Sequence, residues 1–478
     1  MRRCRTVVFT MLVPLLLAAG CGTDSPTEPE NRGIKSGLSP YNHIKTFTIK
    51  HGPLMEAEAD FVAERYDLFV GDKTWIAEMR AINPDILVLA YASAMVNDTE
   101  IFGGTCTIHE LCAETFAAQE GYDVEDFFLH YREDISYDFN FPVGGLMTVS
   151  IPGWNPDREA GDPPATATSR SEARVWATWD YQSRWGNVAD PGWQHWTCER
   201  IAALNEHGGY ELDGVLMDNV ARSLPEMEWM HFDKIAEYGE EPVTNSFSMI
   251  DDNYAFAVIV RDYLAQTFES PKIIVGNATH PWFLIDETVN CGRLQERYDW
   301  FLLECGVRID NAVVGATCSY EVTWLQILEV MELAKRGKKI LFGGKENTWT
   351  DRGALFCLST FYLINHTNMY YAQHGLGLDW FDGIAYDIGL PVGDPYEWAT
   401  GLDPAAPANT FHIMARSYDH ALVLVKFRPE ASMSQYTMTS TTHALGASYR
   451  PLNADGTLGD PVTEVDLRNN EAAILIPE

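Results

Sequence analysis

The sequence is short of basic residues and lacks both long apolar segments and phosphate-binding glycine motifs. Its 478 residues include 34 Lys and Arg against 68 Asp and Glu, a formal net charge of −34. A chain this acidic does not offer the basic surface that nucleic acid requires, so no nucleic acid is expected as a partner. No GxGxxG motif follows the first apolar segment, and GxxxxGK followed by Ser or Thr is absent. These absences argue against a nucleotide-binding sheet.

Closely spaced metal ligands are also lacking. The nine cysteines are scattered without a CxxC pair, and the first apolar segment contains no HxH pair. Zinc sites and metal-dependent barrel hydrolases are built from ligands at such short spacings. The sequence therefore predicts no metal and no organic cofactor.

The first 21 residues have the pattern of an export signal. The segment MRRCRTVVFTMLVPLLLAAGC begins with basic residues, continues in an apolar run from Val7 to Leu17, and has small residues before Cys21. This pattern is typical of a bacterial lipoprotein signal (1–21) in which Cys21 becomes the lipidated first residue; the alternative is an ordinary cleaved secretory signal. Residues 22–40 are polar and suit a flexible tether. We expect an exported protein, anchored by lipid on Cys21 in the bacterial cell envelope, at the outer membrane or cell surface.

Short apolar segments alternate with helical segments along most of the chain, which is the pattern of a parallel β/α fold. Eight segments are expected to be strands: IKTFTIK (44–50), YDLFVG (66–71), DILVLAY (85–91), LDGVLMD (212–218), KIIVG (272–276), WFLLE (300–304), KKILFGG (338–344) and NMYYAQ (368–373). Eight strands at these intervals favour a (β/α)8 TIM barrel over an open doubly wound sheet. The predicted barrel covers residues 41–404.

Two regions depart from a minimal barrel. Residues 96–189 form a long insertion after the third strand, before the helix that leads into the fourth. From 405 to 478, apolar and polar residues alternate and turn sequences recur, which predicts a small C-terminal antiparallel β-sandwich. The expected fold is therefore of the α/β class, a TIM barrel with an insertion and a terminal sandwich.

Two carboxylates directly terminate strongly apolar strands. Asp218 ends the fourth strand and Glu304 ends the sixth, and TIM barrels carry their chemistry at these carboxyl ends. Glycosidic bonds are broken by two such groups, one a nucleophile or base and the other a general acid. We assign the first role to Asp218 and the second to Glu304. The competing interpretation of Asp218 is that it only caps the next helix. Asp213, near the start of the same strand, is expected to be a structural aspartate. The competing interpretation of Glu304 is a satisfied polar residue beneath a loop.

Further polar residues follow the other strands and are candidate substrate-binding groups: Asp72, Tyr91, Asn219, Asn277, Lys345, Glu346 and His374. In the insertion, Trp179 and Asp180 combine an aromatic face with a hydrogen-bonding group, the pairing on which sugars bind. The alternatives are that Lys345 pairs with Glu346, that His374 is structural, and that Trp179 packs the insertion onto the barrel.

Several stretches together resemble one family. RYDLFVGDKTWIAEMRAINPDILVLAYAS, RWGNVADPGWQHWTCERIAALN with ELDGVLMDNV, WFLLECG and LFGGKENTW resemble the glycoside-hydrolase-like (β/α)8 family, related in architecture to melibiases and endo-polygalactosaminidases. The resemblance covers most of residues 43–380 and implies that Asp218 stands at the nucleophile position and Glu304 at the acid position. The long insertion is not part of the family's common pattern.

These observations lead to two hypotheses. The first is an exported glycoside hydrolase that acts on an extracellular or envelope polysaccharide or oligosaccharide. The second is a catalytically inactive glycan-binding surface lipoprotein that keeps the barrel and its aromatic residues.

Overall fold

The computed structural model describes most of the chain from residue 41 to Glu478. The described residues are 41–50, 52–93, 96–97, 113–128, 130–131, 142–143, 147–148, 176–177, 180–218, 235–236, 246–278, 281, 292–309, 320–346, 350–373, 377–404, 406–428 and 440–478. Cys21 and the expected tether 22–40 lie outside them.

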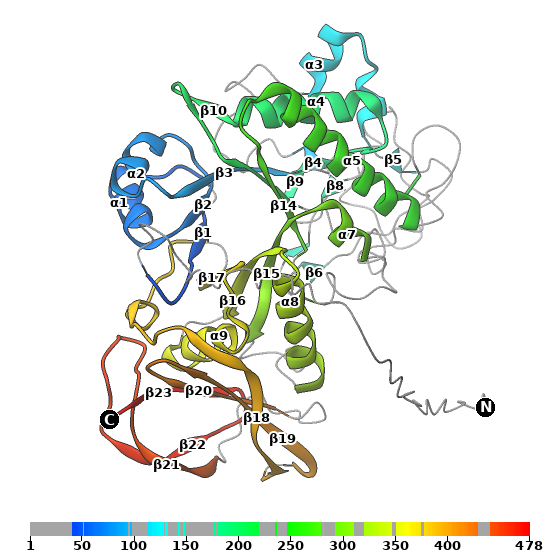
Figure 1. The fold of residues 1–478 in the computed structure, drawn as a ribbon. Helices are drawn as coiled ribbons and strands as arrows, with labels where there is room; N and C mark the ends of the chain where they lie inside the picture. Colours follow the sequence, from blue (N-terminus) through cyan, green and yellow to red (C-terminus); the bar gives the residue numbers. More distant parts are fainter. Residues whose placement is uncertain are drawn as a thin grey trace, which may run out of the picture.

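Eight parallel strands form one sheet whose order in space equals their order along the chain (Figure 1). They are β1 (Phe47–Ile49), β2 (Leu68–Val70), β3 (Leu87–Ser93), β12 (Gly214–Asp218), β14 (Ile273–Asn277), β15 (Trp300–Ile309), β16 (Lys339–Glu346) and β17 (Met369–Gln373). Thr46 forms a parallel bridge to Tyr371, and Tyr371 N donates to Lys45 O at 2.8 Å. The last strand therefore lies beside the segment that enters β1. All eight predicted strands are present, and the predicted α/β TIM barrel is confirmed.

Helices lie between these strands along the chain. They include α1 (Glu56–Arg65), α2 (Ile76–Ile82), α4 (Pro191–Leu204), α5 (Ser246–Thr267), α7 (Gly292–Arg297), α8 (Leu325–Lys335) and α9 (Asp351–Ile364). Helix α4 begins where the sequence predicted: Asp190 accepts a hydrogen bond from Trp193 N at 2.8 Å, and Pro191 is the first helical residue. A side-chain acceptor and a proline are the residues that best satisfy the free N–H groups of a helix start.

The interior of the barrel is an apolar cluster made of alternate strand residues. Its buried members are Phe47, Ile49, Leu68, Val70, Leu89, Tyr91, Leu216, Val275, Leu302, Leu341, Tyr370 and Ala372. Their neighbours along the strands, such as Val215 and Met217, belong instead to the cluster that packs against the helices. Because side chains alternate between the two faces of a strand, Asp218 is on the same side as Leu216, facing the barrel axis.

The described part of the insertion consists of short elements. They are β4 (Val96–Asn97), α3 (Ala113–Glu120), η2 (Val124–Phe127), β5 (His130–Tyr131), β6 (Pro142–Val143), β7 (Met147–Thr148), β8 (Trp176–Ala177) and β9 (Asp180–Trp185). The Phe128 ring meets Trp193 of α4 edge to face at 5.9 Å, and Trp193 lies 5.0 Å from Trp196. Both tryptophans are buried, so they pack the insertion against the barrel.

Two short antiparallel strand pairs lie outside the barrel sheet. β10 (Glu206–His207) and β11 (Tyr210–Glu211) form a hairpin ahead of β12, and β13 (Ile235–Ala236) pairs with β5.

Among the described residues, no helix combines the length and the apolar character needed to cross a bilayer.

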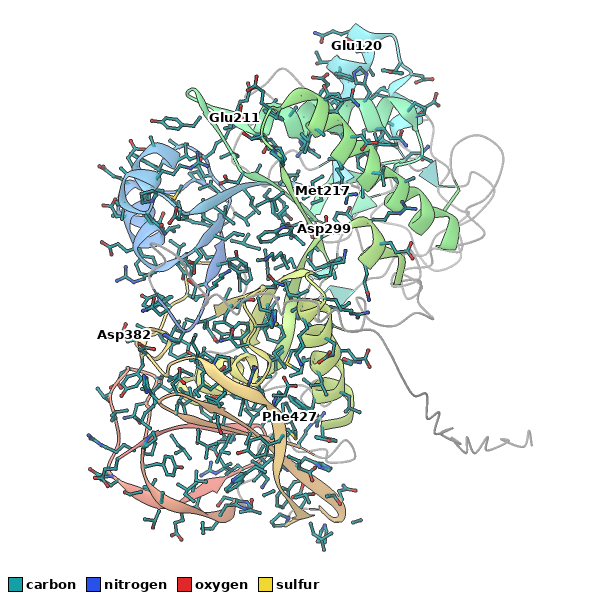
Figure 2. All side chains as sticks on the ribbon, in the orientation of Figure 1. Glu120, Glu211, Met217, Asp299, Asp382 and Phe427 are labelled. Carbon is teal, nitrogen blue, oxygen red and sulfur yellow. The ribbon has the colours of Figure 1, made fainter. Side chains whose placement is uncertain are left out.

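The C-terminal β-sandwich is built from one antiparallel six-stranded sheet. Its order is β18 (Pro391–Asp403), β19 (Ala406–Tyr418), β20 (Leu422–Phe427), β23 (Glu471–Pro477), β21 (Thr441–Pro451) and β22 (Val462–Leu467). The sheet begins at Pro391, ahead of residue 405, where we expected the module to start. Phe427, labelled in Figure 2, lies where the sandwich meets the barrel, with its ring 5.7 Å from that of Trp324 and 5.9 Å from that of Phe356.

Candidate active site

Asp218 is the last residue of β12, and both of its carboxylate oxygens accept hydrogen bonds from neighbouring strands. Asn277, the last residue of β14, donates from Nδ2 to Oδ1 at 2.6 Å, and the Tyr91 hydroxyl on β3 donates to Oδ2. β3 and β14 flank β12 on its two sides, and Tyr91 lies opposite Leu216 in the register. Three side chains proposed from strand positions alone are thus brought together at one carboxylate.

Glu304 lies within β15 rather than at its end. The predicted strand 300–304 continues to Ile309, and its register with β16 shifts between Leu303 and Val307. The extra residues form a bulge, which bends a strand and redirects its side chains. The prediction that Glu304 terminates the sixth strand is therefore wrong. The Glu304 side chain is 17% exposed. Glu304 follows Leu302, a residue of the barrel interior, by two positions.

The bulge depends on a glycine that the sequence analysis did not single out. A Cβ on Gly343 of β16 would lie 2.6 Å from the backbone oxygen of Glu304. No side chain fits at that approach, so Gly343 lets β16 run beside the bulged segment. The signal in the sequence was the pair Gly343-Gly344 inside an otherwise apolar strand, since such glycines mark bulges and close backbone contacts.

Lys345 pairs with Glu304 across β16 and β15. Lys345 Nζ lies 3.5 Å from Glu304 Oε1, and its side chain is 28% exposed. The alternative pairing of Lys345 with Glu346 stays untested. Glu346 is the last residue of β16, but its side chain is not described. Glu304 therefore has one ammonium group beside it, on a strand that is next but one to that of Asp218 in the sheet.

Asp72 is engaged in local hydrogen bonds. Its Oδ2 accepts from Leu54 N at 2.9 Å, and its Oδ1 accepts from Thr74 N at 2.9 Å and from Thr74 Oγ1 at 2.7 Å. These bonds join the loops that follow β1 and β2. The next residue, Lys73, donates to the carbonyls of Ala203 and Leu204 near the end of α4. Burial lowers the pKa of Lys73, against a smaller opposing effect of nearby carboxylates.

Four predicted residues lie outside the described part of the chain: Trp179, Asn219, His374 and the lipidation candidate Cys21. Asp180 is the first residue of β9, and its side chain is likewise not described. The alternative role of Asp218 as a helix cap depends on the residues that follow it, which lie outside the described ranges too.

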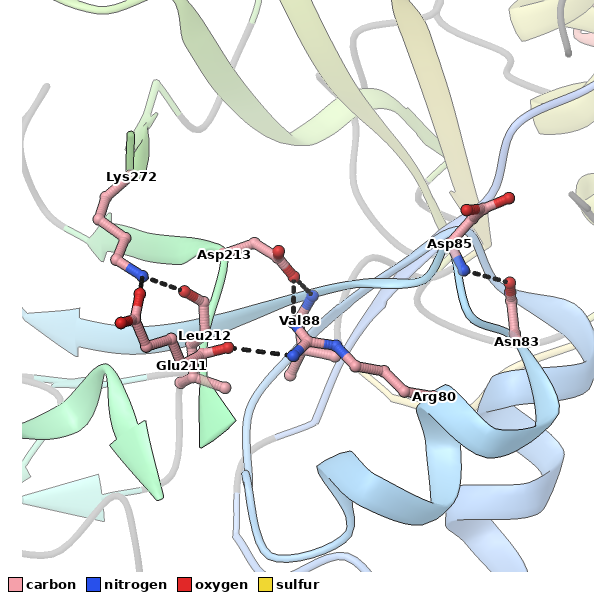
Figure 3. A network of polar contacts seen from close by, with 8 residues as sticks. All are labelled: Arg80, Asn83, Asp85, Val88, Glu211, Leu212, Asp213 and Lys272. Atoms are coloured by element: carbon pink, nitrogen blue, oxygen red, sulfur yellow. Dashed lines mark hydrogen bonds and ion pairs between the residues drawn. The ribbon is translucent and has the colours of Figure 1, made fainter. Parts of the chain in front are cut away.

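The second aspartate of the fourth strand has the structural role that the sequence suggested. Asp213 precedes β12, and its Oδ2 accepts from Arg80 Nη2 at 2.9 Å and from Val88 N at 2.7 Å (Figure 3). Beside it, Lys272 Nζ donates to Glu211 Oε2 at 2.8 Å. The four charged side chains line a cavity of about 660 Å³ at the amino ends of the strands. Asp213 therefore joins three segments at the end of the barrel away from Asp218.

Within the described residues, no group of three or more His, Cys, Asp or Glu side chains is placed to hold a metal ion.

Comparison with known proteins finds no matching protein family and no matching curated protein. Among solved structures, a trehalulose synthase aligns over 91% of this chain and 99% of its own, with TM-score 0.43 and 9% identity. A glycoside hydrolase family 30 subfamily 8 xylanase from Clostridium acetobutylicum aligns over 92% of this chain and 97% of that one, with TM-score 0.36 and 9% identity. A GH36 alpha-galactosidase from Geobacillus stearothermophilus covers 88% and 52%, with TM-score 0.32 and 8% identity. Similarities this distant carry no argument about chemistry, which has to be made from the site.

Proposed function

We propose that the protein is an exported glycoside hydrolase that cleaves an O-glycosidic bond of an extracellular or envelope polysaccharide with Asp218 and Glu304. One observation carries the proposal: Asp218 ends β12 facing the barrel axis, with hydrogen-bond donors from both flanking strands on its two oxygens. TIM barrels carry their chemistry at this end of the strands. Glu304, one strand beyond β14, supplies the second carboxyl that glycoside hydrolysis needs.

The two carboxyl groups have different roles in this proposal. Glu304 donates a proton to the leaving glycosidic oxygen. Asp218 either attacks the anomeric carbon to form a glycosyl-enzyme bond, which water then hydrolyses with net retention of configuration, or activates a water molecule that attacks directly with inversion. Proton NMR of the first product formed identifies its anomer and so distinguishes these two courses.

A catalytically inactive glycan-binding surface lipoprotein is the second candidate, and one contact favours it. Lys345 Nζ lies 3.5 Å from Glu304 Oε1, so this carboxyl is engaged in an ion pair and is not free to face a leaving oxygen. In the enzyme hypothesis, substrate has to draw Lys345 away from Glu304. In the binding hypothesis, the pair stays intact and only orients the ligand.

The deciding experiment measures reducing-sugar release from a panel of polysaccharides. Parent protein that begins at about residue 38 is compared with its Asp218→Asn and Glu304→Gln variants, which keep the size of each side chain. Release by the parent and by neither variant supports the hydrolase. A glycan that all three proteins bind with equal affinity and none of them cuts supports the binding protein instead.

The lipid anchor is part of the proposal and has its own test. The apolar run and small residues before Cys21 support it. We expect a Cys21→Ser variant, expressed in bacteria, to leave the membrane fraction and appear in the soluble fraction. A variant that fractionates like the parent contradicts the anchor but not the hydrolase.

A further inference from the structure

Tyr91 and Asn277 were both expected to bind substrate, yet their polar ends are directed at Asp218. The Tyr91 hydroxyl donates to Oδ2, and Asn277 Nδ2 donates to Oδ1 at 2.6 Å. The two residues are 6% and 5% exposed. Both polar ends are thus engaged with the carboxylate, and little of either residue is exposed to a ligand.

The two donors approach Asp218 from opposite sides. Tyr91 lies on β3 and Asn277 on β14, while β12 runs between them. A carboxylate with one donor on each oxygen has both of its side-chain torsions determined, because rotation about either bond would lengthen a hydrogen bond.

On this geometry we infer that Tyr91 and Asn277 are positioning residues, which hold the Asp218 carboxylate oriented toward the reacting carbon or water. The inference rests on the proposed function, since it assigns how the same site works. Groups that act only through Asp218 contribute to the chemical step, whereas groups that contact sugar contribute to binding as well. Loss of either donor is therefore expected to lower kcat and to leave KM nearly unchanged.

The test compares Tyr91→Phe with Tyr370→Phe in the full chain. Both tyrosines belong to the interior cluster of the barrel and both are 6% exposed, so the two variants remove the same atom from the same core. A hydrogen bond to a charged group is worth enough to lower kcat about 10- to 100-fold in Tyr91→Phe. Tyr370→Phe should keep the parental kcat, and Asn277→Ala should behave like Tyr91→Phe.

The readouts separate this inference from the proposed function. Hydrolysis by the parent and its loss in Asp218→Asn first establish the enzyme with the chosen polysaccharide. A Tyr91→Phe variant that keeps the parental kcat, or one whose KM rises while kcat is kept, then overturns the positioning role and leaves the hydrolase standing. Thermal unfolding of both Phe variants shows whether a fall in kcat merely reports a loosened core, because such loosening would lower the melting temperature of Tyr91→Phe alone.

Discussion

Lys345 and Glu304 form an ion pair between β16 and β15, with Nζ 3.5 Å from Oε1. The pair lies beside the bulge that interrupts the register of these two strands. The ion pair joins the proposed acid, Glu304, to the ammonium group of Lys345, so the position of each side chain depends on the other.

Replacement of Lys345 should therefore affect catalysis more than stability. We expect Lys345→Met to lower kcat/KM by about tenfold, because the site loses the charged group that pairs with Glu304. Lys335→Met is the matched control, since Lys335 is 30% exposed and pairs with Glu332 on α8. Steady-state kinetics of the two variants at one pH makes the comparison. Equal kcat/KM values in both would show that Lys345 is only a surface charge of the barrel.

The two aspartates at the ends of β12 should respond differently to substitution. Asp213→Ala removes the acceptor of Val88 N and of Arg80 Nη2, so we expect the free energy of unfolding to fall by about 1–3 kcal/mol with kcat unchanged. Asp218→Asn should abolish hydrolysis while it changes stability much less. Urea denaturation and kinetics on both variants test the distinction. A fall in kcat in Asp213→Ala, measured where the variant is fully folded, would contradict it.

Gly343 should tolerate no side chain. A Cβ there would lie 2.6 Å from the backbone oxygen of Glu304, so Gly343→Ala must displace the bulge. We expect a loss of about 1–3 kcal/mol in stability, with a fall in kcat because Glu304 moves. Gly459→Ala is the control, since its added Cβ would be 3.5 Å from its nearest neighbour. Parental kcat in Gly343→Ala would mean that the bulge does not position Glu304.

Lys426 should make the stability of the sandwich depend on pH. It is 1% exposed, and burial lowers its pKa from the ordinary 10.5 to about 8, while nearby carboxylates oppose the shift. Between pH 8 and 10.5 the unfolded chain keeps a proton that the folded chain has released. The contribution of Lys426 to the free energy of unfolding therefore rises with pH across this window, by up to about 3 kcal/mol. Below pH 8 both states hold the proton, and the cost of the buried charge is fully present.

The measurement is urea denaturation of the parent and of Lys426→Met at intervals from pH 7 to pH 10. Every other titrating group is common to the two proteins, so the difference between their unfolding free energies isolates Lys426. The parent should gain stability relative to the variant as pH rises. A difference that stays constant with pH would show that Lys426 keeps its ordinary titration in the folded protein.

Much of the barrel could be predicted because its signals are local. The segment 212–218 is apolar, and the observed strand is Gly214–Asp218. The start of α4 follows from Asp190 and Pro191, which are adjacent in the chain and act on the next turn. Such signals lie within a few residues of the structure that they determine.

The sixth strand shows where local signals end. Its apolar residues 300–304 predicted a short strand, yet it extends to Ile309 because β16 pairs with it beyond the bulge. That extension depends on Gly343, a residue of a different strand, and on the register between the two. A pattern read along one segment contains no information about either.

By itself, the sequence determined that Asp218 closes a buried strand and that polar residues follow the other strands of a barrel. Only the tertiary structure decided which of them meet. Tyr91 is 127 residues from Asp218 and Asn277 is 59 residues away. Their hydrogen bonds exist because the registers of β3, β12 and β14 place Tyr91 opposite Leu216 and bring the end of β14 beside the end of β12. Register is set by the packing of all eight strands around one core, which no single segment encodes.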